Sequence, residues 1–214
     1  MTMEELVRNL TRTGVLKSPC IIEAFLNVDR KDFLPAGMER MAYFDEALPI
    51  GYGQTISQPY TVAFMLELLA PEVGDRIMDV GYGSGWTSVV LAHIVREEGR
   101  IYAFERVREL CEFGEENVKK YPEYEKRIEF FCKDATPGLP QEARPEGGFD
   151  GIIVAAELSE VPNAWREQLK RGGRLVYPKA NSIFQEKKGN ADSFDVREYH
   201  GFVFVPFIPD EDAS

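Results

Sequence analysis

From residue 58 onwards, the chain alternates helical stretches with short apolar strands, and this alternation limits the possible folds more than any other feature. We expect helices at residues 58–70, 86–99, 107–121 and 161–170, and strands at residues 76–83, 100–106, 128–135, 149–157 and 172–180. Strands that alternate with helices form parallel sheets, because each helix carries the chain back across the sheet. The pattern therefore predicts an α/β fold with a doubly wound, mostly parallel sheet.

The two ends of the chain add to this core. Residues 4–12 and 19–28 have the apolar spacing of helices, while residues 182–189 and 196–208 read as an antiparallel pair of strands. We expect one domain over residues 1–214. It would consist of a helical N-terminal extension (1–55), a cofactor-binding core (56–180), and C-terminal strands with an acidic tail (181–214).

The charge of the chain limits its partners. Its 25 Lys and Arg residues stand against 36 Asp and Glu residues, a formal net charge of -11 at pH 7. Binding to nucleic acid through phosphates needs clustered basic residues, so no such partner is expected. No apolar run approaches the ~20 residues of a membrane span, and the N-terminus lacks the pattern of a signal peptide. We expect a cytoplasmic monomer that binds neither nucleic acid nor membranes.

The cysteines and histidines do not form a metal-binding pattern. Cys20, Cys111 and Cys132 are far apart, and neither they nor His93 and His200 have the spacing of a zinc site. No metal is therefore expected, and the cysteines are expected to be reduced, partly buried thiols. His93 lies in "VVLAHIV" and is expected to be a helix residue rather than a catalyst.

A glycine-rich loop joins a strand to a helix in "DVGYGSGW", residues 79–86. Gly81, Gly83 and Gly85 lack a Cβ atom, so the backbone can turn sharply and approach a ligand closely. A phosphate loop would need GK[ST], and a dinucleotide fingerprint would need G-x-G-x-x-G. S-adenosylmethionine fits the loop best, with Asp79 counted among its binding residues, and a tight turn without a ligand is the alternative.

Acidic residues end the next two strands of the expected sheet. Glu105 closes "IYAFER" about 20 residues beyond the loop, where a carboxylate can accept hydrogen bonds from both ribose hydroxyls. Asp134, near the end of "IEFFCKDA", can accept from an adenine amino group. Arg106 and Ala135 are expected to line the same cofactor site. Taken alone, each carboxylate could also be an ordinary strand-end or turn residue.

A polar segment, "IGYGQTISQPYTV", precedes the helix expected at residues 58–70. Ser57 followed by Pro59 is a suitable helix start, because the hydroxyl can cap free N–H groups and proline fits the first turn. Capping explains one hydroxyl but not Gln54 or Thr55, so the segment also indicates a functional role.

These motifs together resemble the protein-L-isoaspartate O-methyltransferase family, which uses S-adenosylmethionine. The similar blocks are "VDRKDFLP", "AYFDEALPIGYGQTISQPYTVAFMLELL", "DVGYGSGW", "FERVREL", "VPNAWREQLKRGGRLVYP" and "FVFVPF". They cover nearly the whole chain in the family order, and "GQTISQP" is specific to the family. The resemblance implies that Ser57 is the active-site residue. It also implies that Gln54, Thr55 and Ile56 line the cofactor, and that Thr55 and Ser57 contact the substrate.

The resemblance also implies a reaction, the methylation of the α-carboxylate of an isoaspartyl residue, with S-adenosylhomocysteine as the product. The ester then closes to a succinimide, and hydrolysis returns some normal aspartate, which repairs aged proteins. A carboxylate with a pKa of ~3.3–3.9 is ionised at pH 7 and needs no general base. This agrees with the lack of a nucleophile–His–Asp arrangement in the sequence. The main task of the enzyme is alignment, and Ser57 can fix the angle of the carboxylate.

Three places depart from the family. Lys133-Asp134-Ala135 stands where Gly-Asp-Gly is usual, "YPKAN" where a Pro-Val-Gly turn is usual, and "ELSEVP" where Ala-Ala-Pro-Glu-Val-Pro is usual. Glu157 thereby comes to the end of the fourth strand, beside the methyl-transfer site. We count it as a substrate-binding residue whose charge would repel an incoming carboxylate, with a solvent-facing side chain as the alternative.

Two other functions remain compatible with the sequence. A methyltransferase of the same fold could act on a small molecule or a specialised peptide, which the changes at residues 157–159 favour. A non-catalytic protein could keep the fold and bind only the nucleoside, although the complete set of Gly81, Gly83, Gly85 and Glu105 counts against it. Methyl transfer to an isoaspartyl peptide would separate the three.

Overall fold

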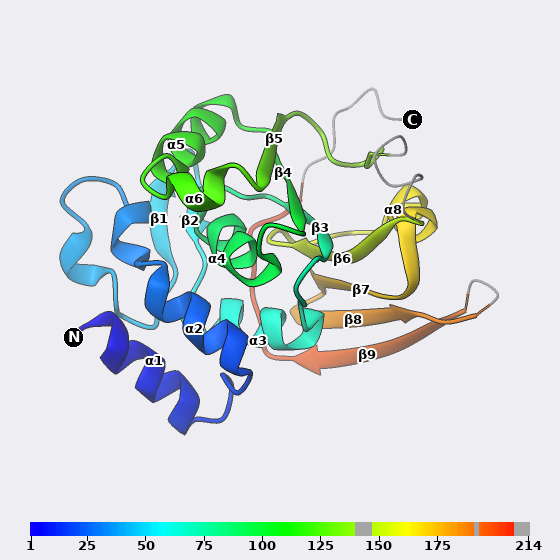
Figure 1. Cartoon of the computed structure of the whole chain (residues 1–214), viewed down its shortest axis with the longest axis horizontal. Helices are drawn as coiled ribbons and strands as arrows, with labels where there is room; N and C mark the ends of the chain where they lie inside the picture. Colours follow the sequence, from blue (N-terminus) through cyan, green and yellow to red (C-terminus); the bar gives the residue numbers. More distant parts are fainter. Residues whose placement is uncertain (140–146, 191–192, 208–214) are drawn as a thin grey trace.

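A mostly parallel sheet forms the centre of the molecule (Figure 1). The computed structural model describes residues 1–139, 147–190 and 193–207, so the acidic tail lies outside the described residues. The seven strands of the described sheet lie in the order β5-β4-β3-β6-β7-β8-β9. They are β3 (Arg76–Val80), β4 (Arg100–Glu105), β5 (Ile128–Cys132), β6 (Phe149–Val154), β7 (Leu169–Lys179), β8 (Ser182–Lys188) and β9 (Phe194–His200).

The direction of these strands confirms the predicted fold class. Strands β3 to β7 pair in parallel, whereas β8 and β9 pair antiparallel to their neighbours. The strand order reverses beside β3, because β4 lies on one side of it and β6 on the other. Ligands of open α/β sheets bind at such a switch point, beyond the carboxyl ends of the strands.

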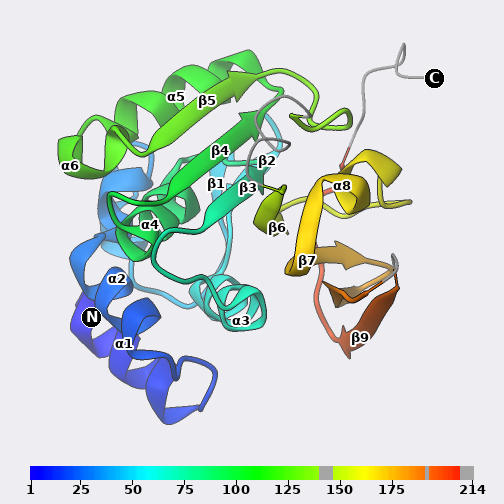
Figure 2. The same cartoon turned by 45° about the vertical axis from the view of Figure 1, so that its right-hand side comes forward.

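Helices cover both faces of the sheet (Figure 2). Ile77 and Ile101 point to the face that packs against the first helices, while Met78 and Tyr102 point to the face that holds Trp165 of α8. The helices are α1 (Met3–Arg12), α2 (Pro19–Asn27), α3 (Pro59–Leu69), α4 (Trp86–Val95), α5 (Arg108–Val118), α6 (Pro122–Glu125) and α8 (Asn163–Gln168). Within the described ranges, no helix combines the length and the apolar character that a membrane span requires.

The N-terminal extension shares its core with the sheet. Helices α1 and α2 form as predicted, and the ring of Phe25 packs edge-on against Trp86 of α4, with ring centres 5.2 Å apart. Two 3₁₀ turns follow, η1 (Arg30–Phe33) and η2 (Glu39–Met41). The chain then forms a separate antiparallel hairpin of β1 (Leu48–Gly51) and β2 (Gln54–Ile56), which leads to Ser57.

Helix α4 is shorter than predicted, since it ends at Val95 rather than at Gly99. The carbonyl of Val95 accepts the N–H of Gly74, and Arg96 takes a φ of 61°, which breaks the helix. Gly99 instead lies in the turn into β4, where a Cβ atom would come within 2.4 Å of the Cβ of Val95. The sequence identified the need for glycine but not the position of the helix end.

The expectation of three reduced thiols is wrong, because Cys111 and Cys132 form a disulfide. Helix α5 packs beside β5, so the two Cα atoms lie 5.9 Å apart although 21 positions separate the residues. Cys20 is the free cysteine, and it is exposed. The pairing depends on tertiary packing, which the spacing of the cysteines does not reveal.

Candidate active site

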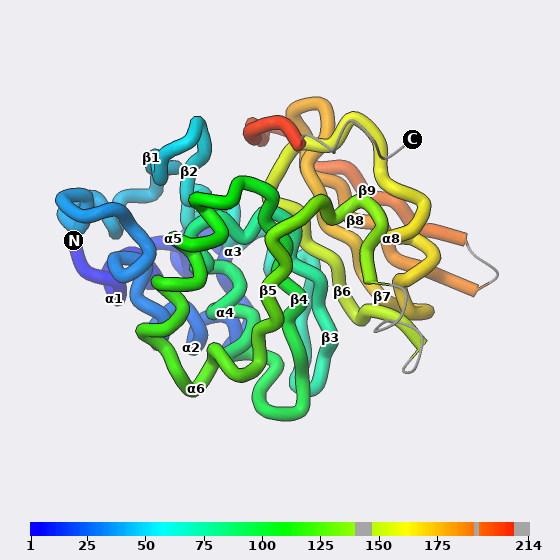
Figure 3. Tube along the Cα trace, turned by 90° about the horizontal axis from the view of Figure 1, so that it is seen from above, coloured from blue at the N-terminus to red at the C-terminus, as the bar shows by residue number. Residues whose placement is uncertain are grey.

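A cavity of about 350 Å³ lies beyond the carboxyl ends of β3, β4 and β5. The β1–β2 hairpin and the C-terminal segment, residues 205–207, close its other sides, and Figure 3 shows both on the same edge of the molecule. This volume is in the range of sites for nucleoside-sized ligands. The predicted site residues that line it are Gln54, Thr55, Ile56, Ser57, Gly81, Gly83, Glu105, Arg106, Asp134 and Ala135.

Two of the loop glycines face the cavity and the third serves packing. Gly81 and Gly83 line the cavity with positive φ values of 83° and 47°, and a Cβ atom on Gly83 would lie 3.2 Å from the side chain of Ile50. Gly85 is absent from the lining. A Cβ atom there would come within 2.8 Å of Val118, so this glycine allows α5 to pack against the start of α4.

Glu105 is held by the backbone around it. Its Oε2 atom accepts the N–H of Gly83 at 3.1 Å, and its Oε1 atom accepts the N–H groups of Arg106 and Val107 at 2.8 and 3.0 Å. A carboxylate has about four acceptor positions, so three donors leave one free position. The sequence predicted two ribose hydroxyls on this carboxylate, and the structure leaves room for one beside the existing bonds.

Asp134 is likewise part of a local turn. Its Oδ1 atom accepts both the N–H and the hydroxyl of Thr136, at 3.1 and 2.9 Å, so Oδ2 is the oxygen left to face a ligand. The carbonyl of Ala135 accepts the indole N–H of Trp165 at 2.8 Å, which ties this corner to α8. The turn-forming and the ligand-binding interpretations of Asp134 are therefore compatible.

Asp79 is buried below the loop and does not line the cavity. Its Oδ2 atom accepts the hydroxyl of Ser88 at 2.6 Å. Burial raises the pKa of Asp79 from 3.8 to about 6, although the bond from Ser88 opposes the shift and the charge of Glu105 adds to it. In this structure, Asp79 supports the base of the glycine loop rather than touching the cavity.

Ser57 is not the cap of α3. The helix begins at Pro59 with Gln58 as its N-cap residue and without a side-chain capping bond, so the capping interpretation is wrong. Ser57 is half-buried and lines both the main cavity and a second one of about 260 Å³. Thr55, Ala155 and Val205 also line both, so the two cavities adjoin at Ser57 and these three residues.

Glu157 lies at the edge of this region. Its N–H donates to Val205 and its carbonyl accepts from Phe207, at 2.7 and 2.8 Å, so its backbone anchors the C-terminal segment. Its side chain is half-buried and is not part of the lining of either cavity. A role of Glu157 in substrate binding stays a prediction.

Sequence reasoning missed several lining residues. Tyr52 stands at the hairpin tip with a φ of 53°, between two glycines that could have marked it. Lys133 was noticed only as a departure from the family, and its Nζ atom lies 4.9 Å from the ring centre of Phe131. Val205 and Phe207 belong to the block "FVFVPF", which carried the resemblance but no predicted role.

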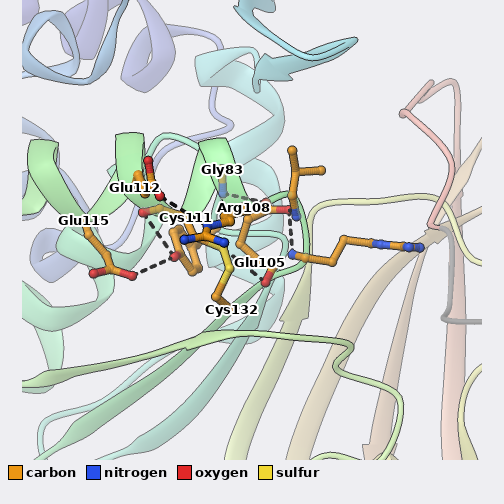
Figure 4. Close-up of a disulfide and its surroundings, with 10 residues drawn as sticks. Gly83, Glu105, Arg108, Cys111, Glu112, Glu115 and Cys132 are labelled. Atoms are coloured by element: carbon orange, nitrogen blue, oxygen red, sulfur yellow. Dashed lines mark hydrogen bonds and ion pairs between the residues drawn. A yellow bond between two sulfur atoms is a disulfide. The ribbon is translucent and has the colours of Figure 1, made fainter.

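The disulfide lies beside Glu105 (Figure 4). Cys132 is the β5 partner of Glu105, and the sulfur of Cys111 lies 3.5 Å from the carbonyl oxygen of Glu105. The bond therefore joins α5 to β5 at the corner that holds this carboxylate. The spacing of the two cysteines in the sequence does not predict this link.

Solved structures with this fold define the class of the protein. A crystal structure of the Plasmodium falciparum protein, described as a protein-L-isoaspartate O-methyltransferase beta-aspartate methyltransferase in complex with S-adenosyl-L-homocysteine, superposes with a TM-score of 0.85. It is 26% identical, and the match covers 96% of this chain and 98% of that one. A second structure, of a protein-L-isoaspartate O-methyltransferase, superposes with a TM-score of 0.85 at 28% identity. That match covers 96% of this chain and 66% of the other chain. The fold is that of the class I methyltransferases.

The chain belongs to the family Protein-L-isoaspartate(D-aspartate) O-methyltransferase (PCMT), whose model matches residues 1–212. A protein-L-isoaspartate O-methyltransferase of Methanopyrus kandleri is 39% identical over an alignment of 212 residues, and the match covers 97% of this chain and 92% of that protein. One of Thermococcus onnurineus is 38% identical over an alignment of 207 residues, and the match covers 94% of this chain and 91% of that protein. The resemblance inferred from the motifs is confirmed.

Proposed function

We propose that this chain transfers a methyl group from S-adenosylmethionine to the α-carboxylate of L-isoaspartyl residues in damaged proteins, leaving S-adenosylhomocysteine. The observation that carries the proposal is the meeting of two cavities beside Ser57. A transfer between two ligands needs two adjoining compartments, and the larger one has the glycine loop and the carboxylates expected of a donor site. Membership of the family supports the choice of acceptor.

The residues around the larger cavity fit the methyl donor. Gly81 and Gly83 bring bare backbone to its wall, where side chains would fill the space. The remaining acceptor position of Glu105 suits one ribose hydroxyl, and the Oδ2 atom of Asp134 suits the adenine amino group. When bound, S-adenosylmethionine supplies a methyl group that is electrophilic because it is attached to a sulfonium.

The acceptor side needs alignment rather than proton transfer. A carboxylate of ordinary pKa, ~3.3–3.9, is already charged at neutral pH, so no general base is required. The hydroxyl of Ser57 can donate a hydrogen bond to one carboxylate oxygen and fix its orientation. Correct placement of two reactants can contribute most of the rate acceleration in such a transfer.

Further properties belong to the same proposal: location, oligomeric state, domain organisation and partners. We infer a cytoplasmic monomer, organised as one unit over residues 1–214, whose partners are isoaspartyl-containing proteins or peptides. The net charge of -11 disfavours nucleic acid as a partner.

The test is methyl transfer from labelled S-adenosylmethionine to an isoaspartyl peptide, with the same peptide carrying ordinary aspartate as the control. We expect label in the isoaspartyl peptide and none above background in the control. Equal labelling of both peptides, or of neither while the donor binds normally, would reject the proposed acceptor and favour another substrate.

A further inference from the structure

A buried arginine holds the segment that carries Ser57. Arg30, in η1, is fully buried. Its Nη1 atom donates to the carbonyl of Ala42 at 2.7 Å, and its Nη2 atom donates to the carbonyls of Glu46 and Ser57 at 2.9 and 3.1 Å. One side chain therefore joins the chain before the β1–β2 hairpin to the residue that follows it.

Among the described residues, no carboxylate contacts the guanidinium of Arg30. The guanidinium lies 5.6 Å from the ring centre of Trp86, and its Nε atom has no hydrogen-bond partner in the described part of the chain. Burial lowers the pKa of Arg30 to about 10, while the negative charge of Asp45 acts in the other direction and raises the pKa. The side chain is therefore charged at neutral pH. A buried cation that contacts only carbonyls and a ring is costly to fold, which points to a role beyond stability.

The bonds around Ser57 show what this charge holds in place. The side-chain carboxylate of Asp45 accepts the backbone N–H of Tyr60 at 2.8 Å. The backbone carbonyl of Asp45 accepts the side-chain amide N–H of Gln58 at 3.0 Å. Arg30 donates a hydrogen bond to the backbone carbonyl of Ser57 itself. Arg30 therefore holds the Ser57 carbonyl while Asp45 holds two residues that follow in the turn into α3, and Ser57 lines both cavities.

We propose that Arg30 is a positioning residue of the methyl-transfer reaction, which sets the orientation of Ser57 and of the carboxylate that Ser57 binds. This inference rests on the proposed function. A planar fork that donates to several carbonyls at once defines an angle as well as a distance, which a flexible ammonium does not. Loss of such positioning reduces turnover more than it reduces binding.

The experiment compares Arg30→Met and Arg30→Lys with Arg174→Met. Arg174 is the matched control, because it also donates to two backbone carbonyls, those of Leu69 and Ala70, but at the far end of α3 and outside both cavities. Affinity for S-adenosylhomocysteine, kcat and KM for an isoaspartyl peptide are measured at a temperature where circular dichroism shows every variant folded.

We expect kcat to fall about a hundredfold in Arg30→Met, with KM and S-adenosylhomocysteine affinity changed by less than about threefold. Arg30→Lys should recover part of the lost kcat because it retains the charge, and Arg174→Met should keep the kcat of the unaltered chain. If Arg30→Met is folded and keeps its kcat, or if Arg174→Met loses as much, the inference is wrong. If Arg30→Met does not fold, Arg30→Lys carries the test, and an unchanged kcat in that variant overturns the inference.

A separate measurement distinguishes failure of the inference from failure of the proposed function. If the unaltered chain transfers no methyl group to the peptide, the proposed acceptor is wrong. Hydrogen exchange at residues 57–60, read by mass spectrometry, then decides the remaining question. Faster exchange there in Arg30→Met than in Arg174→Met supports positioning by Arg30, and equal exchange overturns it.

Discussion

The Oδ1 atom of Asp45 accepts a hydrogen bond from the backbone N–H of Tyr60 at 2.8 Å, in the first turn of α3. Asp45 thus satisfies a free donor at the start of the helix, the task that the sequence had suggested for Ser57. Because Asp45, 15 positions before Tyr60, accepts this N–H group, the hydroxyl of Ser57 remains available to the two cavities.

These separate roles predict that one substitution mainly lowers stability and the other mainly lowers kcat. Asp45→Ala should lower the free energy of unfolding by about 1 kcal/mol, the usual cost of a lost helix cap. Ser57→Ala should change stability by less than about 0.5 kcal/mol while it lowers kcat at least about tenfold. Urea denaturation and peptide methylation measure both. A Ser57→Ala variant that keeps its kcat would exclude Ser57 from the alignment of the substrate carboxylate.

Glu105 should be a major contributor to cofactor affinity. Replacing its carboxylate in Glu105→Gln should weaken S-adenosylhomocysteine binding by roughly 1.5–3 kcal/mol, the range for hydrogen bonds to a charged group. The control is Glu112→Gln, an exposed position on α5, which should bind like the unaltered chain. Titration calorimetry measures both affinities, and equal values for the two variants would exclude Glu105 from the donor site.

Asp79 should make stability depend on pH. Its folded pKa of about 6 lies above the ordinary value of 3.8, so the native state binds this proton more tightly than the unfolded state. Its contribution is therefore fully present below about pH 4 and is lost as the pH rises through about 6. Asp79→Asn should raise the free energy of unfolding by about 3 kcal/mol at pH 8 and by less than about 1 kcal/mol at pH 4.

Urea titrations of the ligand-free chain across this pH range provide the measurement. Burial also raises the pKa of Asp75 to about 6. Subtraction of the curve of the unaltered chain from that of Asp79→Asn removes the contribution of Asp75. A difference between the two curves that does not vary with pH would show that the Asp79 carboxyl does not titrate in this window.

The disulfide predicts one free thiol per denatured chain, that of Cys20, when thiols are counted without reductant. Closing a loop between residues 21 positions apart should contribute about 3 kcal/mol to stability. Added reductant should therefore lower the melting temperature. Cys20→Ala should keep this sensitivity and Cys132→Ala should lose it. Three reactive thiols would support the original expectation of reduced cysteines.

Glu157 offers a test of a departure from the family. A Glu157 charge ~6 Å from the substrate carboxylate would repel it by about 3 kcal/mol and slow the reaction roughly a hundredfold. In that case Glu157→Ala would raise kcat/KM. The backbone of Glu157 anchors residues 205–207 while its side chain lies outside both linings, so we expect a change of less than about threefold. A large gain that shrinks with added salt would support repulsion, and a loss would make Glu157 a substrate-binding residue.

The sequence alone determined the features that depend on local order. The alternation of strands and helices gave the fold class, because each element reveals itself through the periodicity of its own apolar residues. The glycine loop and Glu105 could be placed at one edge of the sheet, since parallel strands bring their carboxyl ends together. The motifs around "GQTISQP" were sufficient to identify the family.

Only the tertiary structure decided which distant residues act on these features. Three contacts join segments that lie far apart in the sequence, and nothing in the sequence predicts them. They are the disulfide between Cys111 and Cys132, the hydrogen bond of Asp45 at the start of α3, and the hydrogen bond from Arg30 to the Ser57 carbonyl. The second cavity likewise exists because residues 203–205 return beside Ser57. Such contacts depend on how the elements pack, and packing is a property of the whole chain that no single stretch of the sequence encodes.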